Sequence, residues 1–480
     1  MSAESETNVG ATPLLVLEPA GPSGPVRVAA EAAAQERRAR ASQRAEEAAR
    51  WKAIQDAGGG TAWIDAELRA KGVLVTADPA TLSDTDKTAY KEKKAAEARE
   101  RRALRKMVTQ AYRATHVAFV GAGIFFRDDN RETSAERDSR LARAKAHDLV
   151  EFDSIEGFAK GLGVSIPALR WLCFHREVQP SSHYRTWTIP KHDGTPRPIT
   201  APKRELKAAQ RWLLRNIVEK LPVHRAAHGF LASRSIATNA TVHAGADVIV
   251  KIDVKDFFPT ISFRRVKGLL RKAGLPENVA TLASLLATEC PRDLVSFRGK
   301  TLYVAKGPRA LPQGAPTSPG ITNAICIRLD RRMSGLARLF GFSYTRYADD
   351  LTFSFRGAPG HPRINAPIGA LLRGANAILK SEGFRLNAKK TTVMRGGSSQ
   401  RITGLVVNRA PEGTPPVRVP RDVVRRLKAA IFNREHNRPG QGTETVQQLK
   451  GLAAFVHMVD PVRGRAFLDR LEALEERQER

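Results

Sequence analysis

The sequence FSYTRYADDLTFSF, residues 342–355, places two adjacent aspartates between two strand-like stretches. Aromatic and β-branched residues, which favour strands, make up most of residues 342–346 and 351–355. The pattern predicts a β-hairpin that carries Asp349 and Asp350 at its turn. Because neighbouring carboxylates repel each other unless a cation or a strong donor compensates, the segment predicts a site for a divalent metal at the tip of this hairpin.

A second acidic segment, KIDVKDFF (residues 251–258), follows the apolar run 248–250. Asp253 is therefore predicted at the end of a buried strand, where its side chain can project into a cleft. Brought together, Asp253 and Asp349 could bridge two metal ions, the arrangement that activates a 3′ hydroxyl and stabilises the leaving pyrophosphate in nucleotidyl transfer. Oxygen ligands favour Mg²⁺, which takes part of its shell from water and substrate phosphates.

Three segments together resemble the motifs of reverse transcriptases. YADD (347–350) resembles the metal-binding motif of that family, and the segment around Asp253 resembles its first aspartate motif. Between them, LPQGAPTSP (311–319) resembles the motif that contacts template and nucleotide. The order and approximate spacing of the three also agree with the family, which argues against a chance match. The resemblance implies Asp253, Asp349 and Asp350 as catalytic residues and ligands of two Mg²⁺ ions.

Two further segments are similar to the retron branch of that family. NATVH (239–243) fits the retron pattern NAxxH, and ITG (402–404) stands where retrons carry VTG, with isoleucine in place of valine. The resemblance covers residues 151–480, and the long basic extension before them is similar to that of the myxobacterial retron enzymes. It implies a set of residues for recognition of retron RNA: Asn239, Ala240, His243, Ile402, Thr403 and Gly404.

The retron resemblance also implies a particular reaction. Such enzymes copy part of a cognate structured non-coding RNA into DNA, with dNTPs as substrates. They prime from the 2′-OH of a branching guanosine, and the product is the branched RNA and DNA hybrid msDNA. Family members serve in defence against phage, usually with an effector, so a defence effector protein is an expected partner.

A cationic hairpin is predicted ahead of the aspartate motifs. Residues 184–190 read as a strand, 191–194 as a turn and 197–199 as the return strand. The hairpin resembles the fingers of reverse transcriptases, where Lys191 and Arg197 match the pair that holds the incoming triphosphate. Arginine can clasp phosphate with two parallel donors, whereas lysine acts as a point charge. The alternative is an ordinary solvated hairpin.

Three more residues match nucleotide-binding positions of the family. Phe258 stands where a bulky side chain lies under the sugar and excludes a 2′ hydroxyl, although a core phenylalanine beside Phe257 is the alternative. Gln313, in a loop stiffened by prolines, would contact template or nucleotide. Lys390 in NAKKT (387–391) matches the lysine that approaches the pyrophosphate, with a simple surface charge as the alternative.

Composition supports a polyanionic partner. Lys and Arg number 79 against 49 Asp and Glu, which gives a net charge of +30. A field of that size favours nucleic acid, in binding that weakens steeply with salt, although a basic ribosome-associated protein would share this composition. The chain has 3 cysteines without a CxxC pair and no apolar stretch of membrane-spanning length. These features predict a cytoplasmic protein with no membrane partner.

The predicted fold is α+β, a right-hand polymerase with fingers, a palm built on an antiparallel sheet, and a helical thumb. We expect a mobile tail over 1–26, a basic helical extension over 27–150, fingers and palm over 151–410 and the thumb over 411–480. Within the extension, residues 29–57 and 84–115 are predicted helices, the second either an RNA-gripping arm or a solvated, charge-laced helix. Apolar spacing in 151–176 predicts Trp171 in the core.

Two other functions remain open from the sequence. One is a different bacterial reverse transcriptase, such as a group II intron enzyme, which the NAxxH match and the lack of a His and Cys cluster after the thumb disfavour. The other is a non-catalytic RNA-binding scaffold with a polymerase fold. Retention of Asp253, Asp349 and Asp350 disfavours the scaffold, because it has no evident need for metal-binding carboxylates.

Overall fold

The computed structural model of the chain describes residues 24–77, 83–128, 131–152, 154–190, 194–357, 367–438 and 444–478. They form two compact units that divide between His116 and Val117. The predicted tail lies outside the described residues up to position 23, and residues 24–26 begin a helix. Within the described ranges, no helix is long and apolar enough to cross a membrane.

The first unit is helical and contains α1 (Gly24–Asp56), α2 (Gly60–Ala70) and α3 (Asp84–Thr115). Both predicted helices are present, whereas α2 was not predicted. Ile64 and Leu68 pack with Leu104 in a small core. Glu97 of α3 accepts hydrogen bonds from Lys94 and Arg101 at 2.9 Å, and these bonds lower the pKa of its carboxyl to about 2. Pairs at this helical spacing are those expected of a charge-laced helix.

The second unit begins with α4 (Ser134–Ala146), α5 (Ile155–Gly161) and α6 (Ile166–Cys173). The side chains of Ser154 and Ser165 cap the N-termini of α5 and α6. The prediction that Trp171 lies in the core is wrong, because its side chain is 53% exposed. α6 is short, and the buried Leu169, Leu172 and Cys173 occupy the face opposite to it.

Two small antiparallel sheets follow. One is the predicted hairpin of β2 (Tyr184–Pro190) and β3 (Pro196–Pro202), whose strands pair along their whole length. The other has the strand order β1-β6-β5 and consists of β1 (Val178–Gln179), β6 (Lys300–Ala305) and β5 (Arg292–Phe297).

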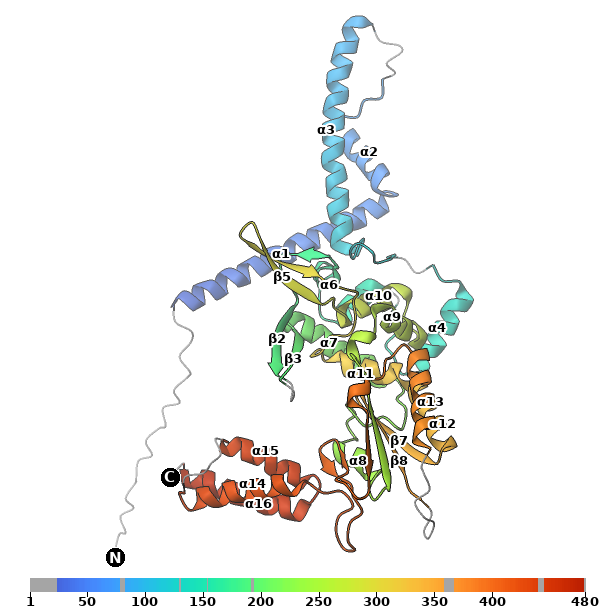
Figure 1. Ribbon diagram of the computed structural model, residues 1–480. Helices are drawn as coiled ribbons and strands as arrows, with labels where there is room; N and C mark the ends of the chain where they lie inside the picture. The colour runs from blue at the N-terminus through green and yellow to red at the C-terminus, as the bar shows by residue number, and fades with distance from the viewer. Residues whose placement is uncertain are drawn as a thin grey trace, which may run out of the picture. The chain divides into compact units, whose positions relative to one another are not determined.

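The central sheet, of which Figure 1 labels β7 and β8, has four antiparallel strands in the order β7-β8-β4-β9. They are β4 (Val248–Asp253), β7 (Phe342–Tyr347), β8 (Asp350–Phe355) and β9 (Thr392–Arg395). The predicted hairpin and the predicted buried strand are therefore both present. Asp253 is the register partner of Asp350, so strands far apart in sequence bring the two acidic segments together.

Each face of this sheet packs on a different hydrophobic core. Val250, Ile252, Leu351 and Phe353 belong to the larger core, whereas Ile249 on the opposite face belongs to the second. Successive side chains of a strand point to opposite faces, so a strand buried on both sides reads as a nearly continuous apolar run. The larger core also holds residues of α12 (Ile327–Leu339) and α13 (Ile368–Ser381).

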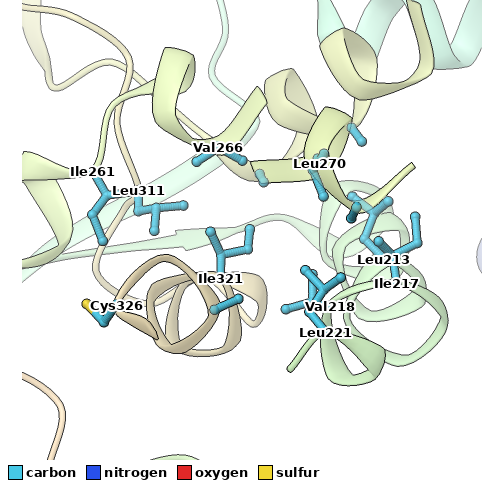
Figure 2. Packing of buried hydrophobic residues seen from close by; sticks show 14 of the residues in the cluster. Leu213, Ile217, Val218, Leu221, Ile261, Val266, Leu270, Leu311, Ile321 and Cys326 are labelled. Atoms are coloured by element: carbon cyan, nitrogen blue, oxygen red, sulfur yellow. The ribbon is translucent and has the colours of Figure 1, made fainter. Parts of the chain in front are cut away.

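The larger core continues away from the sheet into a helical layer (Figure 2). Figure 2 shows Leu213, Ile217 and Val218 near Ile321, and Val266 and Leu270 in the same cluster. A fully buried Leu, Ile or Val side chain contributes about 1.5–3 kcal/mol. The layer consists of α7 (Arg204–Asn216), η2 (Val218–Lys220), α9 (Phe263–Ala273), α10 (Glu277–Ala287) and α11 (Thr317–Ile325).

The second core is formed mostly by residues from the C-terminal part of the chain. It joins the sheet to α14 (Arg421–Glu435), α15 (Val446–His457) and α16 (Pro461–Gln478) through buried residues such as Leu427 and Leu471. The short elements near the two cores are α8 (Ile236–Thr241), η3 (Phe258–Thr260), η4 (Ala388–Lys390), β10 (Arg401–Ile402) and β11 (Leu405–Val406).

A buried ion pair links the central hairpin to α12. Arg346 of β7 donates to both carboxylate oxygens of Asp330, with Nε–Oδ1 at 2.9 Å and Nη2–Oδ2 at 2.8 Å, and both side chains are fully buried. The Tyr344 hydroxyl also donates to Asp330 at 2.9 Å. Arg346 Nη1 donates to Asn323 Oδ1 at 3.0 Å. Such a pair is costly to break, because either partner alone is a buried, uncompensated charge.

We expect Asp330→Ala to lower the free energy of unfolding by about 3–5 kcal/mol, since it leaves the Arg346 guanidinium unpaired in the core. Urea denaturation measures the change. Glu435→Ala is the matched control, because Glu435 forms the same two-bonded pair with Arg470 but both side chains are partly exposed. Its loss should cost less than about 1 kcal/mol. Equal losses in the two variants would contradict the role assigned to burial.

Candidate active site

Three carboxylates converge at one edge of the central sheet. Asp253 is the last residue of β4, and Asp350, the first residue of β8, lies directly opposite. Opposed residues of antiparallel strands have Cα atoms about 4.5–5.5 Å apart. Asp349 precedes Asp350 in the turn, and its carbonyl accepts from the Val254 amide at 3.1 Å. The structure therefore brings together the three aspartates that the sequence predicted.

The turn that carries Asp349 is held from two sides. Ala348 has φ of 55°, an unfavourable value for a residue with a side chain. Arg346 Nη1 donates to the Ala348 carbonyl at 3.3 Å. On the other side, a Cβ atom on Gly229 would lie 2.9 Å from the Ala348 nitrogen, so only glycine fits there. The Gly229 carbonyl accepts from Asn323, which also binds Arg346.

Burial and the close spacing of the carboxylates raise the pKa values of Asp349 and Asp350. Burial, followed by the charges of Asp350 and Asp253, raises the pKa of Asp349. Burial also raises the pKa of Asp350, although the nearby Lys251 opposes this shift. Lys251 Nζ lies 3.7 Å from Asp350, and Lys390 Nζ lies 3.5 Å from Asp253. The site thus favours cations, and two lysine side chains supply part of the compensating charge.

The donor set suits a divalent metal that shares its ligands with a substrate. Among the described residues, no group of three or more His, Cys, Asp and Glu side chains already surrounds a common metal position. Asp350 and Asp253 instead face Lys251 and Lys390, cations that a metal would displace or supplement. An incomplete shell of carboxylate oxygens is what Mg²⁺ requires when substrate phosphates and water provide the remaining ligands.

Two residues of the site had no role assigned from sequence. Asn387 Nδ2 donates to Asp253 Oδ1 at 2.7 Å, and its backbone amide donates to the Asp253 carbonyl at 2.9 Å. It therefore orients the carboxylate. The other residue is Lys251. Its position could have been predicted from the sequence, because it lies two residues before Asp253 on the same strand and therefore on the same face. Asn387 is the first residue of the NAKKT segment, whose match to the family placed Lys390 at the site but gave Asn387 no role.

The predicted nucleotide-binding residues are only partly described. Lys191 lies outside the described residues, whereas Arg197 is exposed on β3 opposite Ile189. Gln313 is half-buried, and its carbonyl accepts from the Thr200 amide at 2.7 Å. Gly314 has φ of 117°, and a Cβ atom there would lie 3.1 Å from the Thr200 carbonyl oxygen. The β2–β3 hairpin is thus attached to the Gln313 loop.

Phe258 and Lys390 lie on short 3₁₀ turns next to the aspartates. Phe258 is half-buried on η3 and packs against the larger core, with its ring centroid 6.0 Å from that of Phe257. Both the core role and contact with a sugar are compatible with this position. Lys390, on η4, has its Nζ 3.5 Å from Asp253 Oδ2, and its contact with pyrophosphate stays a prediction.

The residues of the NAxxH and ITG segments differ in exposure. The side chains of Asn239, Ala240, His243 and Ile402 are buried. The first three contact the central hairpin or the second core. Thr403 is half-buried and Gly404 exposed, so these two offer the accessible part of the set, and recognition of retron RNA by the six residues stays a prediction.

Comparison with known proteins places this site in a class. Residues 189–419 match the family model described as reverse transcriptase (RNA-dependent DNA polymerase). This span contains the central sheet and all three aspartates, so the converging carboxylates belong to a reverse transcriptase domain of mixed helices and sheet. Domains of this class generally use divalent metal ions.

Proteins with similar sequences show which kind of reverse transcriptase this chain resembles. The chain is 57% identical over 430 residues to the retron Mx162 reverse transcriptase of Myxococcus xanthus, covering 89% of each protein. It is 42% identical over 306 residues to the retron Mx65 enzyme of the same organism, covering 64% of this chain and 68% of the relative. Identity to the retron Ec86 enzyme of Escherichia coli is 32% over 327 residues, covering 68% of this chain and 90% of the relative.

The chain belongs to the retron reverse transcriptases. It is an RNA-directed DNA polymerase that uses an RNA template and dNTPs. The family predicted from the NAxxH and ITG segments is confirmed, and membership excludes the group II intron alternative.

We expect Asp349→Asn to raise the melting temperature of the metal-free protein at about pH 8. A raised carboxyl pKa in the folded state means that folding favours the protonated form, so the penalty appears as the pH rises above the unfolded value of about 3.9. It is complete above the folded-state pKa. The gain should therefore shrink towards about pH 4, and added Mg²⁺ should reduce it by stabilising the wild-type carboxylates. Differential scanning calorimetry across pH measures this gain, and a gain that does not vary with pH would contradict it.

We expect Gly229→Ala to lower kcat by about tenfold or more, because the new methyl group would displace the Ala348 backbone and with it Asp349. Steady-state primer extension measures the effect. Gly268→Ala is the control, since Gly268 lies in α9 and a Cβ atom there meets nothing within 4 Å. That change should leave kcat unaltered and stabilise the helix by up to about 1 kcal/mol. Normal kcat in Gly229→Ala would show that the turn tolerates displacement.

Proposed function

We propose that Asp253, Asp349 and Asp350 hold two Mg²⁺ ions and that this chain copies part of a cognate structured RNA into DNA at that site. The observation that supports the proposal most is the strand register that sets Asp253 opposite Asp350, beside the half-buried Asp349. The raised pKa values of Asp349 and Asp350 point the same way, because a site that destabilises its own carboxylates gains most from a bound cation.

Each residue has a proposed part in nucleotidyl transfer. Bound Mg²⁺ would activate the primer hydroxyl and neutralise the leaving pyrophosphate. Asp253 is kept in orientation by Asn387, while Asp350 assists Asp349. Lys390 stands beside Asp253, where it can meet negative charge that develops on the departing phosphates.

The remaining nucleotide contacts come from segments around the carboxylates. Arg197, together with Lys191, holds the triphosphate. Phe258 lies under the sugar and excludes a 2′ hydroxyl, and Gln313 contacts template or nucleotide. The attachment of β3 to the Gln313 loop supports a shared role for the two segments, because the Thr200 amide donates to the Gln313 carbonyl three residues from Arg197.

The architecture we propose is a right-hand polymerase. The β2–β3 hairpin belongs to the fingers, the central sheet forms the palm within residues 151–410, and α14–α16 form the thumb within residues 411–480. On α14, four exposed cations can follow a nucleic-acid backbone without reading its sequence. They are Arg421, Arg425, Arg426 and Lys428. The basic residues before position 150 would form an extension that assists RNA binding.

Synthesis begins, in this proposal, at the 2′-OH of a branching guanosine in the cognate RNA, and the product is branched msDNA. The support is membership of the retron family together with the Thr403–Gly404 turn, which offers a surface for that RNA. We further propose a role in defence against phage with an effector protein, on the strength of family resemblance alone.

The deciding experiment omits any primer. Purified protein is incubated with Mg²⁺, labelled dNTPs and RNA transcribed from the flanking genomic region, and the products are run before and after debranching enzyme. We expect a labelled product that shortens on debranching. Activity on an ordinary primed template without any unprimed product would overturn self-primed synthesis from that RNA.

The same assay tests the carboxylates. Asp349→Ala should abolish synthesis and leave binding of the RNA nearly unchanged, because the phosphate contacts that dominate affinity lie elsewhere. Asp293→Ala, which removes an exposed carboxylate from β5, is the matched control and should be fully active. Synthesis by Asp349→Ala would overturn the proposed site.

A further inference from the structure

Helix α8 buries two polar side chains against the hairpin that carries the catalytic aspartates. His243, which follows α8, contacts Ser354 Oγ through Nδ1 and Thr345 Oγ1 through Nε2, each at 2.7 Å. Thr345 Oγ1 in turn donates to Asn239 Oδ1 at 2.7 Å. All four side chains are buried. The imidazole therefore bridges β7 and β8 on the face of the hairpin that is opposite to Arg346.

The proton positions in this network follow from its connections. In the assignment in which the Thr345 hydroxyl donates to Asn239 Oδ1, that hydroxyl accepts from His243, and Nε2 carries the ring proton. Nδ1 is then an acceptor, and the Ser354 hydroxyl donates to it. Burial lowers the pKa of His243 to about 3, which keeps the ring neutral and this pattern of donors intact at physiological pH.

The network lies along the hairpin, on the face that also carries Asp350. Thr345 is two residues before Tyr347, the last residue of β7, and Ser354 is four residues after Asp350 on the same face of β8. The opposite face of the hairpin is fixed by Arg346 and Asp330. Polar contacts therefore fix both faces of the hairpin. On the face that carries Thr345 and Ser354, His243 makes these contacts.

The other end of α8 is attached to the ITG segment. Thr403 Oγ1 donates to the carbonyl of Ile236, the first residue of α8, at 3.2 Å. Thr403 and Gly404 form a two-residue turn with φ of 46° and 88°. A β-branched residue is strained at such a φ, and strain of this kind persists only where surrounding contacts enforce it. The two retron segments are therefore joined through one short helix.

We propose that His243 is a positioning residue for polymerisation. It fixes the spacing of β7 and β8 so that Asp349 and Asp350 face Asp253, and α8 connects this support to the Thr403–Gly404 turn. The inference rests on the proposed function, because it requires that Asp349 and Asp350 bind the metal ions. Its distinctive consequence is that weakening the network alters the metal requirement of the enzyme.

The test removes one hydroxyl without changing shape. Thr345→Val keeps the branched side chain but leaves His243 Nε2 and Asn239 Oδ1 without a partner, whereas Thr345→Ser keeps the hydroxyl. Full-length enzyme is assayed on an ordinary RNA template with a DNA primer, with Mg²⁺ and dNTP varied separately. We expect Thr345→Val to lower kcat by about tenfold or more and to raise the Mg²⁺ concentration for half-maximal activity. The KM for dNTP should change by less than about twofold, and Thr345→Ser should restore wild-type values.

The control is Thr281→Val, which removes an equally buried hydroxyl from α10, where its bond stays within the helix. It should leave the Mg²⁺ requirement unchanged even if the protein is less stable. If Thr345→Val fails to fold, Ser354→Ala takes its place by the same criteria, since it removes the partner of His243 Nδ1.

A folded variant with wild-type kcat and Mg²⁺ requirement would overturn the inference, as would a loss of thermal stability alone. The two proposals fail separately. Inactive Asp349→Ala with normal Thr345→Val overturns only the positioning role of His243, whereas active Asp349→Ala overturns the proposed metal site itself.

Discussion

The buried pair of Arg346 and Asp330 is the interaction on which the site depends. A carboxylate-rich turn tends to open, because its charges repel each other and Ala348 is strained. Arg346 opposes this by binding the Ala348 carbonyl with the same side chain that pairs with Asp330 of α12. Through Asn323, it is also connected to the segment of Gly229, which packs against the turn. One guanidinium therefore joins a core helix, the hairpin and the neighbouring loop.

The sheet adds the second part of the arrangement. β4 lies between β8 and β9 and pairs with both, so the strand that ends in Asp253 has no free edge along most of its length. Asn387, shortly before β9, then orients the carboxylate. A hydrophobic core on each face fixes the sheet, and the charged groups meet only at its end. Stability comes from the interior, while the exposed edge is left for chemistry.

Much of this was predictable because strands and their faces follow a simple period. The alternation in 342–355 and the apolar run before Asp253 specify strands, and two acidic strand ends suggest one site. What could not be predicted are the partners that come from elsewhere. Nothing in the sequence pairs Arg346 with Asp330 or Asn387 with Asp253, because such contacts depend on tertiary packing. Trp171 was misplaced for a related reason, since almost every residue of this eight-residue helix is apolar and the sequence does not show which face is buried.

The register of β4 against β8 also constrains how this chain can vary. Shifting one strand by a single residue would exchange its two faces, placing Asp350 in the larger core and Leu351 at the carboxylate edge. An insertion or deletion within either strand would thus abolish folding and catalysis in the same step. Turns that connect paired strands, such as the one between β5 and β6, are free of this constraint, provided their ends remain fixed. Among active homologues, insertions and deletions should therefore occur in the loops, whereas the strands that bear the aspartates keep their length.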